Sequence, residues 1–153
     1  MKQNQSEEKL YLEDLAVGDL FVSPPHALDM QQIVGFASQF DPQPFHLDEE
    51  AARDSFFEGL AASGWHTAAI TMRLLVQSFP LAKGLIGAGA ELNWSQPTRP
   101  GDVLQVTSTI KDIAHSRSRP DRAIVVVESV TSNQHGAVLQ RLTSKVVAFK
   151  RPA

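Results

Sequence analysis

The chain has 153 residues, 42% of them hydrophobic, which is enough for one domain of ordinary size with its own core. Its formal net charge of −3 at pH 7 excludes the strongly basic surface that broad binding to nucleic acid requires. The absence of cysteine excludes a disulfide framework, a thiolate nucleophile and a cysteine-based metal site.

The N-terminus is polar, without the apolar stretch of a signal peptide, and no segment reaches the roughly 20 apolar residues of a membrane span. We therefore expect a cytoplasmic protein with no membrane contact. Residues 1–10 are expected to form a flexible polar tail, and residues 11–153 a single domain.

The first half of the domain predicts one strand followed by helices. Residues 18–29 favour a short strand that its two adjacent prolines end. Asp29 is a suitable N-cap for a helix over residues 30–40. A short acidic helix is expected over residues 48–56.

A long apolar helix is expected between residues 62 and 80, where Pro80 stops it. Its apolar side chains form one wide stripe that should face the core: Trp65, Ala68, Ala69, Met72, Leu75, Val76 and Phe79. A helix this apolar is typical of one enclosed by the rest of the fold.

After Pro80 the pattern changes to segments rich in Val, Ile and Thr, which favour strands. Four are expected, over residues 90–97, 102–115, 122–133 and 137–150, with turns at 99–102 and 133–136. This order predicts an α+β fold in which one antiparallel sheet wraps around the buried helix. Such a sheet leaves a face or edge uncovered, so we expect a homodimer.

The segment FDPQPFHLD, residues 40–48, is the main candidate for chemistry. On a continuous helix Asp41 and His46 would point about 140° apart, but Pro42 and Pro44 predict an irregular, stiff bend in which the two can meet. Stiffness suits catalysis, because a misplacement of about 1 Å can cost around 100-fold in rate. An acid and an imidazole in an apolar pocket make a plausible proton-transfer pair.

Four neighbours are expected to keep water from this pair: Phe40, Pro42, Pro44 and Phe45. In such surroundings the pKa of Asp41 should rise unless the carboxylate accepts hydrogen bonds, with His46 the obvious donor. A structural alternative is that Asp-Pro merely ends a helix and His46 bonds a carbonyl group. The five histidines are scattered along the chain, so no metal site is expected.

Gly64 is expected to open the long helix. Helix N-termini present free N–H groups and a positive dipole end, which can stabilise an oxyanion. The alternative is plain capping, with Ser63 as the N-cap.

Three stretches, FASQFDPQPFHLDEEAA, ASGWHTAAITMRLL and AELNWSQPTRPGDVL, together resemble the MaoC-like dehydratases, the relatives of (R)-specific enoyl-CoA hydratases. The likeness runs from about residue 12 to residue 150. It implies a hot-dog fold, in which an antiparallel sheet wraps a long central helix, and a homodimer. It also implies an acyl-CoA thioester as substrate, with coenzyme A part of the substrate and no separate cofactor.

The resemblance implies reversible hydration of a trans-2-enoyl-CoA to a (R)-3-hydroxyacyl-CoA. Asp41 and His46 match the catalytic pair of the family, with Asp41 as base toward water and His46 as acid. The Gly64 amide matches the contact to the thioester carbonyl. Ser63, Gln43, Trp65 and Met72 are the further candidates for contact with substrate.

The sequence departs from the hydratase pattern at two of these positions. Gln43 stands where an asparagine is usual, and Met72 replaces a serine common in the central helix. Both changes leave open a non-catalytic acyl-CoA-binding dimer. A thioesterase is a weaker alternative, because no acid occurs between Gly64 and Phe79 to activate water at the carbonyl group.

Three further features are open. His66 is expected to be a satisfied core or surface histidine rather than a pocket residue, and Trp65 and Met72 are expected to be core residues that shape an acyl tunnel. A basic cluster in the loop before residue 122 is either solvated or in contact with coenzyme A phosphates: Arg117, Arg119 and Arg122.

Overall fold

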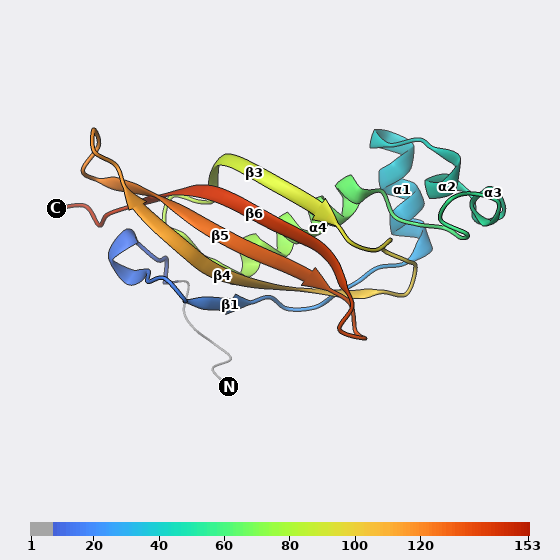
Figure 1. Ribbon diagram of the computed structural model, residues 1–153, viewed down its shortest axis with the longest axis horizontal. Coiled ribbons are helices and arrows are strands. Elements are labelled where there is room, and N and C mark those ends of the chain that lie inside the picture. Colours follow the sequence, from blue (N-terminus) through green and yellow to red (C-terminus); the bar gives the residue numbers. More distant parts are fainter. Residues whose placement is uncertain (1–7) are drawn as a thin grey trace.

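The computed structural model describes residues 8–153 and has the sheet as its main feature (Figure 1). The elements are a 3₁₀ helix Leu12–Asp14, β1 Leu20–Val22, β2 His26–Ala27, α1 Met30–Phe40, α2 Pro44–Leu47, α3 Glu49–Arg53, α4 Gly64–Ser78, β3 Ile86–Trp94, β4 Val103–His115, β5 Arg122–Ser132 and β6 Val138–Phe149. No helix in residues 8–153 is long and apolar enough to cross a membrane.

The sheet is antiparallel, with strand order β1-β4-β5-β6-β3 and with β2 also paired to β4. It curves along α4, while α1, α2 and α3 gather at one end of the molecule (Figure 1). The expected antiparallel sheet around a long helix is therefore confirmed. Strand β3 begins at Ile86, four residues before the expected start at residue 90, and among the strands of residues 8–153 it lies at the sheet edge beside β6.

The core lies between the sheet and α4. Leu75 of α4 and its C-cap residue Phe79 pack against inward side chains of the sheet, among them Ile110, Val125 and Val127, which are fully buried. A second cluster joins the other end of α4 to α1. Burying a large aliphatic or aromatic side chain stabilises a fold by about 1.5–3 kcal/mol, so these two clusters fix α4 against the sheet.

The face of α4 that lies inward differs from the expected apolar stripe. Trp65, Met72 and Val76 are exposed, whereas the buried face carries Thr67 and Thr71 with several apolar residues. The prediction that Trp65 and Met72 are core residues is therefore wrong for the single chain. The prediction failed because the threonine hydroxyls have hydrogen-bond partners inside the fold, so these polar side chains can be buried without loss of hydrogen bonds.

The segment after α1 also differs from the expected irregular bend. Asp29 caps α1 as predicted, accepting a hydrogen bond from the Gln32 N–H, and α1 ends at Phe40 before Pro42. Pro44 then occupies the first position of a one-turn helix, α2, where a missing N–H costs nothing. His46 thus lies on a short helix rather than on an irregular loop.

The C-terminus lies at the end of the molecule opposite α1–α3 (Figure 1). Leu10, within the expected tail, lies beside Leu81 in a parallel bridge: its N–H donates to the Pro80 carbonyl, and its carbonyl accepts from the Ala82 N–H. Residues 1–7 of that tail lie outside the described part. The basic loop between β4 and β5 also lies at the opposite end from α1–α3, and Arg122 there pairs with Asp121. Within one chain, the basic cluster is therefore remote from that end.

Candidate active site

Asp41 and His46 come together at the junction of α1 and α2. The C-cap position of α1 holds Asp41, and one turn of α2 brings His46 back toward it, so that His46 Nε2 lies 3.3 Å from Asp41 Oδ2. The Asp41 side chain is 16% exposed and the His46 side chain 5%. The pair is thus enclosed but open to solvent on the carboxylate side.

The other ring nitrogen of His46 is fixed by the backbone. Its Nδ1 lies 2.6 Å from the carbonyl oxygen of Ala61, which can only accept, so Nδ1 carries a hydrogen. Neutral His46 then offers Nε2 as an acceptor, and a carboxylate facing it requires a proton or a water between the two. The geometry therefore directs Nε2 and Oδ2 to proton exchange.

Asp41 is held in its ionised form. Burial alone would raise the pKa of this carboxyl group, but hydrogen bonds from Ser63 and Gln43 and the nearby His46 outweigh it and lower the pKa below its ordinary value. The Gln43 contact is short, with Nε2 2.6 Å from Asp41 Oδ1. From the sequence we expected that hydrogen bonds to the carboxylate could prevent a raised pKa, but we identified only His46 as the donor.

The aromatic surroundings of His46 come from α2 and from the loop after α3. Phe45 meets the imidazole edge-on at 4.6 Å between ring centroids, and Phe57 lies at 5.9 Å. Phe40 is 69% exposed, and Pro42 and Pro44 are exposed as well. Of the four residues expected to exclude water, only Phe45 shields the pair, because the end of α1 turns the other three outward.

Gly64 opens α4 as expected. Ser63 caps the helix, accepting a hydrogen bond from the Trp65 N–H at 3.2 Å, while the Gly64 N–H makes no hydrogen bond within residues 8–153. Gly64 also lines the cavity that holds Asp41 and His46. A free helix N-terminal donor is thus available to an oxygen atom in the cavity.

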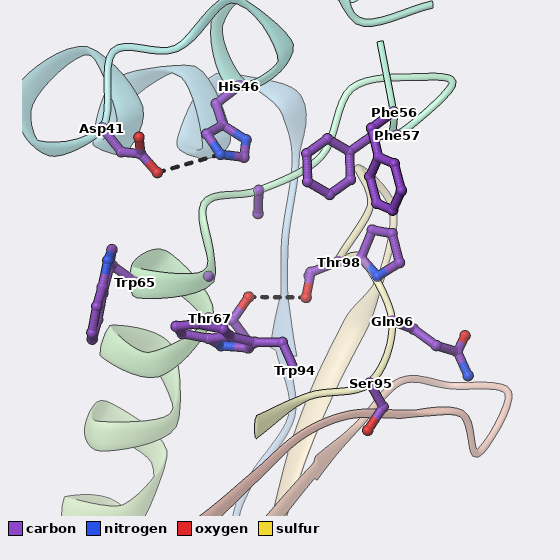
Figure 2. A pocket seen from close by; sticks show the side chains of 13 residues that line it. Asp41, His46, Phe56, Phe57, Trp65, Thr67, Trp94, Ser95, Gln96 and Thr98 are labelled. Atoms are coloured by element: carbon purple, nitrogen blue, oxygen red, sulfur yellow. Dashed lines mark hydrogen bonds and ion pairs between the residues drawn. The ribbon is translucent and has the colours of Figure 1, made fainter. Parts of the chain in front are cut away.

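This cavity has a volume of about 430 Å³. Figure 2 shows Asp41 and His46 on one side of it, Trp94 opposite them, and Trp65 and Phe57 on its flanks. Thr67 and Thr98 also line it and bond each other through their hydroxyl groups at 2.9 Å, which fixes the start of α4 against the segment after β3 (Figure 2). The cavity is mainly apolar, with one acid–base pair.

The other candidate residues are spread over different places. Gln43 bonds Asp41 from outside the cavity, and Ser63 is completely buried beneath it. Trp65 lines the cavity, but Met72 lines a separate groove further along α4. His66 is buried and stacked on Phe36, and its Nδ1 has no hydrogen-bond partner in the described residues, so it is buried but not satisfied.

Sequence reasoning missed three residues that shape the site: Phe57, Trp94 and Arg99. The Arg99 guanidinium donates to the backbone carbonyls of Phe57, Gly59 and Leu60 and so holds the loop that carries Phe57. Arg99 lies in the turn predicted at residues 99–102, for which the sequence predicted no role beyond the turn. No local pattern in the sequence connects residue 99 with residue 57, because their contact is tertiary.

The family profile described as "MaoC like domain" matches residues 16–134, and the chain belongs to this family. A crystal structure of the MaoC-like dehydratase from Rhodospirillum rubrum is 66% identical with a TM-score of 0.92, covering 94% of this chain and 99% of that one. The (R)-hydratase from A. caviae is 25% identical with a TM-score of 0.71, covering 91% of this chain and 99% of that one. The 3-hydroxybutyryl-CoA dehydratase of Methylorubrum extorquens is 32% identical over 111 residues, 72% of this chain and 69% of that protein.

These likenesses and the sheet around α4 confirm the hot-dog fold that the sequence pattern implied. They also confirm the resemblance to MaoC-like dehydratases and support a hydro-lyase at the level of the family.

Proposed function

We propose that this protein is a hydro-lyase that interconverts a trans-2-enoyl-CoA and a (R)-3-hydroxyacyl-CoA. The observation that carries the proposal is that Asp41, His46 and the unbonded N–H of Gly64 meet at one cavity. The name of the Methylorubrum extorquens relative supports an acyl-CoA substrate. Coenzyme A enters as part of that substrate, and the reaction requires no further cofactor.

In the hydration direction, a water between Asp41 and protonated His46 attacks C3 of the enoyl thioester. Asp41, ionised because its pKa is lowered, takes a proton from the water as the O–C3 bond forms. The C2–C3 π electrons move toward the carbonyl, whose developing negative charge accepts a hydrogen bond from the Gly64 N–H. His46 Nε2–H then protonates C2, and the proton on Asp41 returns to His46 across their 3.3 Å contact.

The catalytic groups are expected to contribute to the rate by the amounts usual for enzymes. A positioned acid or base contributes about 10²–10⁴-fold to a rate. One oxyanion donor contributes about 10²–10³-fold. Loss of either member of the Asp41–His46 pair should therefore remove most of the turnover.

The test is loss of enoyl-thioester absorbance with purified protein and a panel of trans-2-enoyl-CoAs, with chiral analysis of the product. We expect turnover to the (R)-alcohol and a fall of about 10³-fold or more in kcat/KM for Asp41→Asn and for His46→Gln. Both substitutions keep the side chain similar in size, and a melting curve checks that the fold is retained. Asp112→Asn and His115→Gln are matched controls, since both residues are exposed on β4 and neither lines the cavity.

Two other results would point elsewhere. Binding of acyl-CoA without turnover would indicate the non-catalytic alternative. Release of free coenzyme A would indicate a thioesterase, which needs a carboxylate at the carbonyl carbon; Asp41 is the only acid lining the cavity in the described residues.

We also propose that the working unit is a homodimer. Strand β3 has one edge that no strand of the described residues pairs with, and the adjacent face of α4 exposes Trp65, Met72 and Val76. Exposed apolar residues beside an open strand edge are typical of an interface. A second copy pairing along β3 would cover both, and light scattering on the purified protein, giving twice the mass of one chain, tests this.

A further inference from the structure

Two cavities follow each other along the seam between α4 and β3. The first is the catalytic cavity described above, bounded by Gly64 and Trp94. The second is an apolar groove of about 330 Å³, bounded by Met72 and Leu75 of α4 and by three small residues of β3, Gly87, Gly89 and Ala90. Going from the first cavity to the second, residue numbers increase along α4 and decrease along β3. Trp94, the last residue of β3, is therefore the residue of that strand where the two cavities come closest.

The Trp94 ring lines the first cavity but not the groove, and Trp94 is the residue through which β3 enters that first cavity. In Figure 2 it lies opposite Asp41 and His46, on the side along which α4 continues toward the groove. It also rests on Gly64, so that a Cβ atom at Gly64 would come within 2.7 Å of Trp94 Cε2. The Trp65 ring meets it edge-on at 5.4 Å between centroids.

Buried hydrogen bonds hold this ring in place. Trp94 Nε1–H donates to Gln140 Oε1 at 2.9 Å, and Gln140, which is completely buried, donates through Nε2 to the Thr71 hydroxyl at 3.0 Å. The Thr71 hydroxyl donates in turn to the Thr67 carbonyl group and accepts from Thr131. A ring fixed by its polar edge, with Gly64 beneath it and Trp65 against it, acts as a wall although it is half-exposed.

We propose that Trp94 closes the catalytic cavity against the apolar groove and so restricts this enzyme to thioesters of short enoyl groups. The inference rests on the hydratase activity proposed above. An acyl group whose carbonyl oxygen reaches Gly64 N–H and whose C3 faces the Asp41–His46 pair meets the Trp94 ring as its tail extends toward Met72 and Leu75. Removing the ring joins the two spaces and admits a longer tail into the groove.

The test compares crotonyl-CoA with trans-2-decenoyl-CoA in three proteins: wild type, Trp94→Ala and Trp94→Phe. In the wild type we expect kcat/KM to be at least about 100-fold lower for the longer substrate. Trp94→Ala should raise kcat/KM for decenoyl-CoA by about tenfold or more, while Trp94→Phe, which keeps an aromatic wall, should retain the preference of the wild type. Trp94 is 45% exposed, so its truncation leaves no sealed cavity, and a melting curve checks folding.

A second substitution tests the route of the tail. Ala90→Leu fills the groove, so adding it to Trp94→Ala should abolish the gain on decenoyl-CoA and leave crotonyl-CoA turnover at the level of Trp94→Ala. An unchanged chain-length profile in Trp94→Ala, or equal use of both substrates by the wild type, would overturn the proposal.

Binding separates failure of this inference from failure of the proposed activity. Calorimetry with the unreactive esters butyryl-CoA and decanoyl-CoA reports the length preference without any chemistry. If the wild type turns over no enoyl-CoA, the hydratase proposal fails, and the binding profile still decides the role of Trp94. Tighter binding of decanoyl-CoA to Trp94→Ala than to the wild type supports the partition; equal binding overturns it.

Discussion

The two groups of buried polar residues beside α4 differ in how far their hydrogen-bonding capacity is used. Between α4 and the sheet, the fully buried Thr71, Thr131 and Gln140 satisfy one another, and Gln140 also accepts from the half-exposed Trp94 indole. At the N-terminal end of α4, His46 Nε2 and the Gly64 N–H face a cavity with capacity to spare. The first group costs little to bury because its hydrogen-bonding groups are all satisfied. The second group can act on a ligand because some of its hydrogen-bonding capacity is unused.

Among changes that leave the Asp41–His46 pair intact, the largest effect is expected at Gly64, where the two groups touch. Gly64→Ala places a Cβ atom 2.7 Å from the Trp94 ring, and the Gln140 hydrogen bond prevents that ring from moving away freely. Because the N–H is retained but displaced, we expect kcat/KM for crotonyl-CoA to fall by about 100-fold, together with a lower melting temperature.

Gly87→Ala is the matched control for this change. It lies on β3, and a Cβ atom there meets nothing within 4 Å in the single chain. Wild-type kinetics in Gly64→Ala would mean that the position of the Gly64 N–H does not matter for the reaction.

A smaller effect is expected when a hydrogen-bonding side chain is removed from the first group, in which the polar side chains satisfy one another. Gln140→Leu removes the partner of Trp94 Nε1–H and a donor to Thr71 while keeping the side chain roughly the same size. Because Trp94 is 45% exposed, water can replace part of the lost hydrogen bond, so the free energy of unfolding in urea should fall by about 1 kcal/mol, the lower end of the cost of an unpaired buried donor. Gln39→Leu, at an exposed position on α1, is the comparison that should leave stability within about 0.5 kcal/mol.

The smallest effect is expected on the pH dependence of kcat/KM, which the cavity group at the N-terminal end of α4 controls. The pKa of Asp41 lies below its ordinary value, so its contacts stabilise the fold above that ordinary value, and the stabilisation is lost as the pH falls through the lowered pKa. Gln43→Ala removes one donor to the carboxylate, so the pKa should rise and the acid limb of kcat/KM should move to higher pH. At neutral pH the change should be less than about tenfold.

A pH–rate profile of Gln43→Ala against wild type gives this measurement. An acid limb that stays in place or moves to lower pH would contradict a base role for ionised Asp41. Gln31→Ala, at an exposed position on α1 away from the carboxylate, should leave the profile unchanged.

Much of the fold followed from local signals in the sequence. Asp29 and Pro42 bound α1, Pro80 follows the end of α4, and alternation of apolar residues gave the last three strands to within one or two residues. These signals act over a few residues, through caps, fixed backbone angles and side-chain period, and therefore need no knowledge of the partner surface. The meeting of Asp41 and His46 is local in the same sense.

Tertiary structure decided the rest. Only packing against the sheet determines that Thr67 and Thr71 face inward and Trp65 and Met72 outward, because both faces of α4 carry apolar residues and the hydroxyl partners come from residues 98 and 131. The same holds for the wall of the cavity, where Trp94 is fixed by a residue 46 positions away. The sequence thus determined that Asp41 and His46 come together, while contacts between distant segments decided the shape of the cavity that they line.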